Sequence, residues 1–462
     1  MPPATSAAHE QPVESVDQLE GTFADGCKPP ADWTIGVEYE KPVVDRDSGE
    51  SVPYEGDRGI GRLLRCMAEN DPRWKPVYEA DSVIALRDGR ASITLEPGGQ
   101  LEMSGEQCAS LFCADEELRG HVAEIVAAGA EIGQRFLALG AVPKTPLAAA
   151  PWMPKGRYRI MRDVMLDKGS LGRSMMQQTA TVQSNFDYAD EADARLKMRV
   201  GYAISPLLVA LSANSPVVDG RASGFRSYRA HVWSDTDPDR CGYLPFVFDS
   251  DSLFAAYTDY ALDVPMYFIA RGDRLVTVER KTFRSFMTDG HDGERATMAD
   301  WNLHLTTLFP EVRLKTYIEV RAADSQPIDL MLGTPALMKG LFYDSDALAA
   351  AWDELRRLPL DRLGDLHESA ARDGMQVRLG RHTARDIAIE LLAIAREGLV
   401  RQAVAGPDGG DESRFLDPLI EQAEAGRCPA DRLIELWEGP WAGNVDRLVE
   451  YAAYSEESTH KH

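Results

Sequence analysis

The 462-residue sequence predicts one large domain that mixes strands and helices, of the α/β or α+β class. Alternating runs around a Pro-Gly-Gly corner at residues 97–99 indicate strands joined by a tight turn. Helical spacing dominates residues 328–454. Because no internal repeat or low-complexity linker interrupts the chain, we expect a single domain over residues 16–454, with disordered tails at 1–15 and 455–462.

The first third of the chain contains most of the predicted strands. Residues 32–44 are expected to form a strand in which Glu38 and Glu40, two positions apart, project from one face. Shorter alternating runs predict further strands at residues 75–79, 82–87 and 90–96, with a return strand after the corner. Helical spacing predicts helices at residues 16–19, 58–69 and 107–139, the last ending at Gly140.

The Pro-Gly-Gly corner has a carboxylate on each side, Glu96 before it and Glu102 after it. Proline presets φ and glycine accepts positive φ, so this tripeptide fits a hairpin corner. The apolar neighbours Leu95 and Leu101 point to the other face. Two acids held on rigid strands form either an ordinary solvated face or half of a site for a hard cation. This stretch alone leaves both interpretations open.

A cationic cluster follows in residues 151–165, where Lys155, Arg157, Arg159 and Arg162 are closely spaced. In so acidic a chain, the cluster is either a basic helix face that pairs with surface acids or a site for a phosphate or carboxylate anion. Both interpretations remain open at this point.

Polar side chains then line one face of a predicted strand. Residues 175–188 alternate so that Gln183 and Asn185 share a face, which indicates a strand lining a polar site. A helix is predicted at residues 190–213, and residues 224–242 are expected to form a functional loop rich in Arg, His, Trp and Asp.

The last predicted strand covers residues 313–324, and Glu319 and Arg321 share one of its faces. An acid beside a base, flanked by apolar residues, is a second candidate for a buried charged site. Other elements expected before it are helices at residues 250–260 and 300–310 and a strand at 265–271.

Composition excludes several classes of protein. With 50 basic and 74 acidic residues the formal charge is −24, which repels nucleic acids and anionic membranes. No signal peptide and no apolar run of roughly 18 residues is recognisable. Six cysteines without a CxxC motif argue against a zinc site or a disulfide framework, and Cys108 and Cys113 are expected to be buried apolar residues. We therefore expect a cytoplasmic protein.

Five carboxylates on separate strands repel one another too strongly to be buried together without cations. Two or more Mg²⁺ ions, with Mn²⁺ as the alternative, would resolve this conflict, because hard cations prefer oxygen ligands. Clustered acids opposed by arginines are typical of phosphoryl transfer from a nucleotide. The sequence has no P-loop, kinase or GxSxG motif. Glycoside hydrolysis by paired carboxylates would not explain the arginines.

Long stretches of the sequence match one family. They include IGVEYEKP, LEPGGQLEMSG, MPKGRYRIMR, TVQSNFDY, RAHVWSDTDPDR and HLTTLFPEVRLKTYIEVRAAD, in this order between about residues 32 and 448. The chain resembles the plant-type glutamate–cysteine ligases. This resemblance implies an α+β fold like the glutamine synthetase catalytic domain: a curved, mainly antiparallel sheet forming a funnel with surrounding helices.

The resemblance also implies the activity and the site residues. Glutamate would react with MgATP to give a γ-glutamyl phosphate, and the cysteine amine would displace phosphate to give γ-glutamylcysteine, the first step of glutathione synthesis. The implied metal ligands are Glu38, Glu40, Glu96, Glu102 and Glu319. Arg321, with Lys155, would meet the ATP phosphates. The implied residues for glutamate are Arg157, Arg229, Gln183, Asn185, Tyr228, Trp233 and Lys155, with Arg157, Arg229 and Arg321 as the catalytic cations.

Departures from the family pattern leave alternatives. Tyr39 and Pro42 replace a histidine and an aromatic residue, and Gln177-Gln178 replaces Phe-Arg. Ala180 stands in place of a common cysteine, which argues against a plant-like redox switch. The alternative functions are a γ-glutamyl ligase that uses another amine or serves another thiol or specialised-metabolite pathway, a silent ligand-binding homologue, and an enzyme that stops at the acyl phosphate. The expected partners are small molecules only, L-glutamate, L-cysteine and ATP, with the protein a monomer or homodimer.

Overall fold

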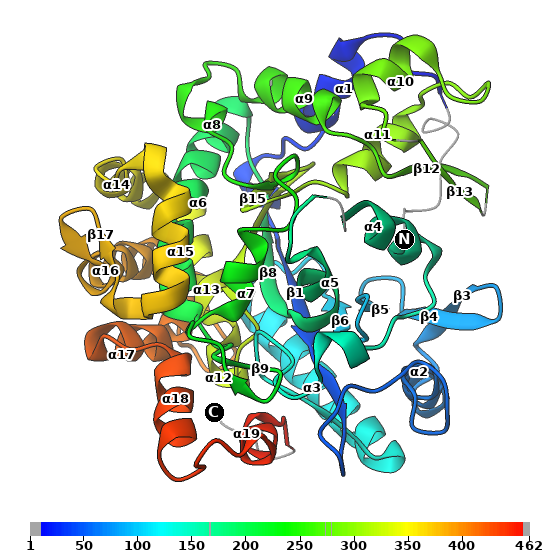
Figure 1. The fold of residues 1–462 in the computed structure, drawn as a ribbon. Coiled ribbons are helices and arrows are strands. Elements are labelled where there is room, and N and C mark those ends of the chain that lie inside the picture. The colour runs from blue at the N-terminus through cyan, green and yellow to red at the C-terminus, as the bar shows by residue number, and fades with distance from the viewer. Residues whose placement is uncertain (1–10, 166–167, 273, 279, 456–462) are drawn as a thin grey trace.

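The centre of the fold is an eight-stranded sheet in which every neighbouring pair of strands is antiparallel (Figure 1). The computed structural model describes residues 11–165, 168–272, 274–278 and 280–455. In sheet order the strands are β15 (Val312–Leu314), β16 (Ile318–Asp324), β8 (Thr181–Phe186), β1 (Ile35–Lys41), β6 (Leu101–Ser104), β5 (Ser92–Leu95), β4 (Ser82–Arg87) and β3 (Lys75–Glu79).

Helices pack on both faces of this sheet. One face is covered by α3 (Leu111–Ile132), α6 (Glu191–Ser212) and α13 (Gly333–Phe342), and α3, α6 and α13 contact β1, β16 and β8 respectively. The opposite face is flanked by shorter helices, α4 (Gly156–Met165), α5 (Gly172–Gln178) and α7 (Tyr228–Trp233). Figure 1 shows α5 and α7 beside the strands β1 and β8, with α4 next to α5. The predicted α+β class with an antiparallel sheet is confirmed.

The remaining elements lie around this centre. The N-terminal and central helices are α1 (Val16–Ala24), α2 (Ile60–Asn70), α8 (Phe246–Asp249), α9 (Leu253–Asp263), α10 (Phe283–Asp289) and α11 (Met298–Leu305). The C-terminal part is mostly helical, as expected, with α12 (Ile328–Met331), α14 (Ser345–Leu355), α15 (Leu363–Asp373), α16 (Ala384–Gln402), α17 (Asp417–Ala425), α18 (Pro429–Glu438) and α19 (Val445–Ala452). Short paired strands include β2 (Val43–Asp45) with β7 (Gln134–Phe136), β11 (Cys241–Gly242) with β14 (Phe309–Pro310), and β12 (Phe268–Arg271) with β13 (Arg274–Thr277).

Four expected elements differ in the structure. The strand predicted at residues 175–188 begins as helix α5, because Met175 and Met176 bury their side chains on a helix before β8 starts at Thr181. The strand predicted at residues 313–324 is a hairpin of β15 and β16. Alternation alone does not reveal the turn between two strands that continue the same pattern.

The other two differences concern helix boundaries. The helix predicted at residues 107–139 ends at Ile132, because Gly133 adopts a left-handed φ of 76° and the chain then enters β7. The region predicted as a loop at residues 224–242 contains α7, whose N-cap Ser227 accepts a hydrogen bond from the Ala230 N–H. A six-residue helix is too short to show a periodic pattern.

Two predictions about the periphery also need correction. Cys108 and Cys113 form a disulfide at the start of α3, where their Cα atoms lie 5.6 Å apart, instead of remaining reduced apolar residues. In the predicted N-terminal tail, residues 1–10 lie outside the described residues, but Val13 donates to the Ala296 carbonyl at 2.9 Å, so this part is anchored. Residues 456–462 of the predicted C-terminal tail are likewise outside the described residues.

The Pro-Gly-Gly corner packs against the backbone of α5. A Cβ atom added to Gly98 would lie 2.3 Å from the Gln177 carbonyl oxygen, and Gly99 has a φ of 88°. Gln100 donates to the Thr179 carbonyl at 2.7 Å. The corner therefore connects the β5–β6 hairpin to the segment that leads into β8.

We expect Gly98→Ala to lower the free energy of unfolding by about 1 to 3 kcal/mol, because the methyl group must displace backbone atoms of α5. Urea denaturation measures this loss. Gly120→Ala is the control: Gly120 lies inside α3 with open space around its Cβ position, so alanine should stabilise the protein by about 0.5 to 1 kcal/mol. Equal effects of the two substitutions would contradict tight packing at the corner.

Candidate active site

The predicted acids and amides lie on the sheet face that α4, α5 and α7 flank. Glu38 is the cross-strand neighbour of Gln183, and Glu40 is the neighbour of Glu102. Glu319 pairs with Asn185 on the far side of β8. Since side chains alternate along each strand, these positions place their side chains on one face. The sheet register therefore brings together groups that are far apart in the sequence.

Glu319 is surrounded by cations. Its carboxylate accepts two hydrogen bonds of 2.7 Å from Arg313 Nη2 and lies 3.2 Å from Lys315 Nζ. Arg321 Nη1 also donates to it. Glu319 is fully buried, which opposes ionisation, but Arg313, Lys315 and Arg321 overcome this and hold its pKa well below the usual range. The charge of Glu319 is thus balanced by the protein itself.

The other four acids are poorly neutralised by the protein. Within the described part of the chain, Glu38 accepts a single hydrogen bond, from Asn185 at 3.1 Å, and Glu40 accepts from the Thr181 N–H at 3.0 Å. Glu102 accepts from Thr94 at 2.7 Å and from Ser104 at 3.2 Å. Glu96 lies within 3.5 Å of the Tyr158 hydroxyl, so it faces the same side as Glu102 and does not point away. Neutral donors stabilise a carboxylate less than a cation does.

The crowding of these acids changes their pKa values. Burial, followed by repulsion from Glu319 and Glu102, raises the pKa of Glu38 to about 7. Burial and the neighbouring Glu102 raise the pKa of Glu96 to about 8. The pKa of Glu40 is raised well above its ordinary value by burial, with Glu96 and Glu102 adding to the effect. Four converging acids with three raised pKa values form a site that attracts cations.

These pKa shifts predict how pH affects the stability of the protein without metal. A carboxyl with a raised pKa keeps its proton to a higher pH in the folded state than in the unfolded state. Its contribution to the free energy of unfolding is therefore lost as pH rises from about 4.5 through the folded-state pKa. We therefore expect the melting temperature without divalent cations to fall between pH 6 and pH 8.5. Added Mg²⁺ should raise it more at pH 8.5 than at pH 6. Thermal unfolding checks this, and Glu96→Gln should flatten the pH dependence.

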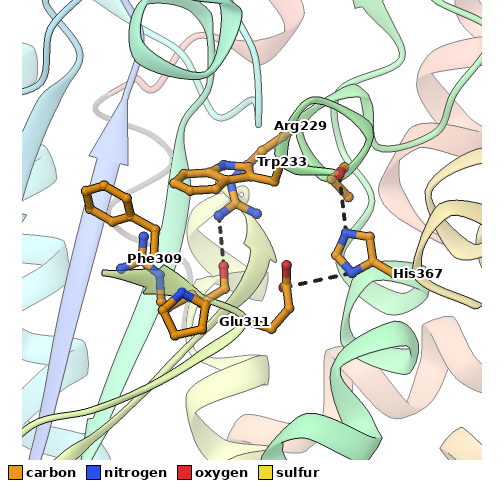
Figure 2. Close-up of a pocket in the computed structure, with 8 residues that line it drawn as sticks. Arg229, Trp233, Phe309, Glu311 and His367 are labelled. Carbon is orange, nitrogen blue, oxygen red and sulfur yellow. Dashed lines mark hydrogen bonds and ion pairs between the residues drawn. The ribbon is translucent and has the colours of Figure 1, made fainter. Parts of the chain in front are cut away.

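Cations of α7 and β16 border this face on one side. Arg229 is buried and its guanidinium donates to the carbonyls of Arg321 at 2.8 Å and Ala322 at 3.3 Å. The guanidinium of Arg321 stacks over the Trp233 ring with its centre 5.6 Å away, and its Nη1 donates to Gln183. Figure 2 shows a pocket in which Arg229, Trp233 and Phe309 surround a small space.

Lys155 and Arg157 lie on the other side of the acids, near Glu96. Lys155 donates to the Leu95 carbonyl at 2.8 Å, and burial lowers its pKa to about 8 against the opposing charge of Glu96. Arg157 acts electrostatically on Glu96, and its buried Nε has no hydrogen-bond partner among the residues that the structure describes. The two predicted glutamate-binding arginines, Arg157 and Arg229, therefore border the acids from different helices, α4 and α7. Tyr228 is half-buried on α7 and does not line the pocket.

The unusual residues of the sequence belong to the scaffold. Tyr39 is fully buried on the sheet face opposite Glu38 and Glu40. Gln177 donates to the carbonyls of Ala150 and Pro151, both at 2.9 Å. Gln178 donates to Asp219 at 3.0 Å. None of these three side chains therefore faces the acids.

Sequence reasoning missed four residues of this region. Arg313 and Lys315 precede Glu319 at alternating positions, a signal that was readable in the sequence, but their role depends on the hairpin turn. Glu311 and His367 line the same pocket as Arg229; Glu311 lies within a stretch that matches the family, but the sequence singled out neither residue. His367 lies on α15, far along the chain, so only the tertiary structure brings it to the site.

Comparison with known proteins identifies the family. The sequence model described as glutamate-cysteine ligase family 2 (GCS2) matches residues 34–451. The chloroplastic glutamate–cysteine ligase of Medicago truncatula is 40% identical over 96% of this chain and 86% of its own length. The chain belongs to glutamate-cysteine ligase family 2. This confirms the predicted family and the prediction that the protein is a ligase.

Other comparisons agree with this family membership. The chloroplastic glutamate–cysteine ligase of Arabidopsis thaliana is 38% identical over 98% of the chain and 85% of its own length. The crystal structure of a glutamate–cysteine ligase from Francisella tularensis in complex with AMP has a TM-score of 0.55, with 13% identity over 92% of this chain and 91% of that one. This likeness confirms the predicted glutamine synthetase-like fold.

The predicted cytoplasmic location is wrong in the light of these relatives. The relatives from Medicago truncatula, Solanum lycopersicum and Oryza sativa are all named chloroplastic. The prediction depended on the lack of an apolar leader and on the cysteine pattern, and neither excludes import into an organelle. Within the described residues, no helix has both the length and the apolar character needed to cross a membrane.

Proposed function

We propose that this family 2 ligase joins the γ-carboxylate of L-glutamate to the amine of L-cysteine, with ATP converted to ADP and phosphate. The supporting observation is the set of four converging acids, Glu38, Glu40, Glu96 and Glu102, bordered by the arginines of α7 and β16. Family membership supports the two amino acids, and the named relatives give no support to another amine acceptor. A monomer or homodimer remains the prediction for the assembly.

The acid cluster fits Mg²⁺ that binds together with a nucleotide. Among the described residues, the only three potential ligands with atoms within 4.8 Å of one another are Glu106, Cys108 and Cys113. The two cysteines form a disulfide and are not available as ligands. The predicted acids therefore do not form a closed cage. Mg²⁺ is usually held by one or two carboxylates together with substrate phosphates, which suits such an open arrangement.

Glu40, Glu102, Glu96 and Glu38 are the residues that would hold these ions. Glu319 differs from them because three protein cations already balance its charge, so we assign it the positioning of Arg321 rather than direct metal binding. Bound Mg²⁺ would supply charge stabilisation on the phosphates of ATP.

The residues of this chain would then perform the remaining tasks. Arg229, Arg321 and Arg157 border the acids and would bind the carboxylate groups of glutamate and the phosphoryl group. Gln183 accepts a hydrogen bond from Arg321 and so holds that side chain in place. Asn185 donates a hydrogen bond to Glu38 and does the same for its carboxylate. The γ-carboxylate of glutamate attacks the γ-phosphorus of ATP, ADP leaves, and the cysteine amine then attacks the acyl phosphate and releases phosphate. The protein supplies positioning and a fixed charge pattern.

Release of ADP, measured with glutamate alone and then with each amino acid in turn, tests the proposal. We expect rapid ADP release only with glutamate and cysteine together in the presence of Mg²⁺, and a product mass equal to that of γ-glutamylcysteine. If a different amine stimulated ADP release, that amine would replace cysteine as the proposed acceptor. A lack of ADP under every condition would contradict the proposal.

A further inference from the structure

The pocket beside Arg229 combines three chemical features (Figure 2). The guanidinium groups of Arg229 and Arg321 provide positive charge, and the rings of Trp233 and Phe309 provide apolar walls. Glu311, between β14 and β15, adds a carboxylate. The head of a free amino acid has the complementary groups, an α-carboxylate and an α-ammonium close together.

Glu311 is a buried acid with little compensation. Its residue is 8% exposed, and among the described residues the only recorded polar contact of its carboxylate is with His367 Nδ1 at 3.8 Å. This distance is too long for a hydrogen bond. The charge of Glu311 acts on Arg229 through space, but among the described residues no Lys or Arg forms an ion pair with it, so a cation on a ligand would be a favourable partner.

The ring of His367 is held at both nitrogens. Its Nε2 lies 3.2 Å from the Ala230 carbonyl, which accepts only, so Nε2 carries the hydrogen. Its Nδ1 lies 3.2 Å from the hydroxyl of Tyr243, a half-buried tyrosine whose pKa is raised well above its ordinary value by desolvation and which therefore donates. The ring held in this way fixes the space beside Glu311.

A second unpartnered group borders the same pocket. The Nε1 of Trp233 is buried and donates to no atom of the described residues. Buried donors without a partner are uncommon, and Trp233 lines the pocket, so an acceptor on a ligand could partner this N–H. The carboxylate of an amino acid bound by Arg229 would provide that acceptor.

We propose that Glu311 binds the α-ammonium group of glutamate and that His367 positions the Glu311 carboxylate. The proposal rests on the proposed function, because it assigns the head of one substrate to this pocket. The α-carboxylate is then held by Arg229 and the Trp233 Nε1–H, and the γ-carboxylate extends toward the acids of the sheet. Glu311 is thus a specificity residue that selects amino acids over simple dicarboxylic acids.

Glutarate, which is glutamate without the α-amino group, provides the test. With cysteine and MgATP, the wild-type kcat/KM should be at least about 30-fold higher for glutamate than for glutarate, as expected when a buried charge pair is lost.

Glu311→Gln should reduce this ratio to within about 3-fold of unity, mainly by raising the KM for glutamate. Glu311→Asp keeps the charge and should recover part of the ratio. His367→Asn should raise the KM for glutamate and leave its kcat and the KM for glutarate unchanged.

Glu368→Gln is the matched control. Glu368 is the neighbour of His367 on α15, and its carboxylate pairs with His231 and Arg372 outside the pocket. This variant should keep the wild-type ratio. An unchanged ratio in Glu311→Gln, an equal loss for both substrates, or a higher KM for cysteine instead of glutamate would overturn the inference. Failure of the proposed function would appear differently, as a wild-type protein without glutamate-dependent ADP release.

Discussion

Glu40→Gln should lower kcat/KM by at least about 100-fold while leaving the protein without metal as stable as the wild type or more stable. The loss of activity follows from removing one carboxylate that is proposed to hold Mg²⁺ against the phosphates of ATP. Stability should not fall because burial, with Glu96 and Glu102, raises the pKa of Glu40 well above its ordinary value, so its charge is unfavourable in the fold. Steady-state kinetics and thermal unfolding at pH 8 measure the two effects.

Glu117→Gln is the matched control for this substitution. Burial raises the pKa of Glu117 to about 7, but the residue lies on α3, on the opposite side of the sheet. The variant should likewise keep the stability of the protein at pH 8, yet retain its activity. If Glu40→Gln retained activity, Glu40 would have no part in binding metal. If it strongly destabilised the protein, the repulsion inferred among the acids would be wrong.

Glu319→Gln should abolish activity as well, but with a large loss of stability. The substitution leaves Arg313, Lys315 and Arg321 without the carboxylate that balances them in a buried position. Breaking a buried ion pair by removing one partner typically costs about 3 to 5 kcal/mol. Arg321 would also lose the contact that aims it at the substrate side of the sheet. Chemical denaturation and kinetics of the purified variant measure both losses.

Glu412→Gln separates stability from activity in this comparison. Glu412 is fully buried, pairs with Lys339 and accepts a hydrogen bond from the Leu111 N–H at 2.6 Å, away from the acids of the sheet. Its substitution should destabilise the protein to a similar degree while the folded fraction keeps its kcat. If Glu319→Gln behaved in the same way, with normal kcat, Glu319 would be a structural residue only.

Local sequence patterns predicted much of the sheet. The strands at residues 75–79 and 82–87 have the predicted limits, and the Pro-Gly-Gly corner turns where it was expected, because proline and glycine restrict the backbone locally. The shared face of Glu38 and Glu40 follows from the two-residue repeat of a strand. Such features depend on neighbouring residues only and are therefore readable from the sequence.

Other features depended on contacts between distant segments. The turn between β15 and β16 was hidden because both strands continue one alternating pattern. The disulfide between Cys108 and Cys113 depends on how the start of α3 places two side chains, which spacing alone does not give. Helix α5 was taken for a strand because a short buried run has no distinctive period.

The sequence by itself determined which acids share a face, and the resemblance to its family pointed to their chemistry. Only the tertiary structure separated their roles: Glu319 is neutralised by Arg313, Lys315 and Arg321, whereas the pKa values of Glu38, Glu40 and Glu96 are each raised by burial and by repulsion from Glu102. The reason is physical. The state of a buried carboxylate depends on the charges within a few ångströms, and those charges come from strands and helices that are distant in the chain.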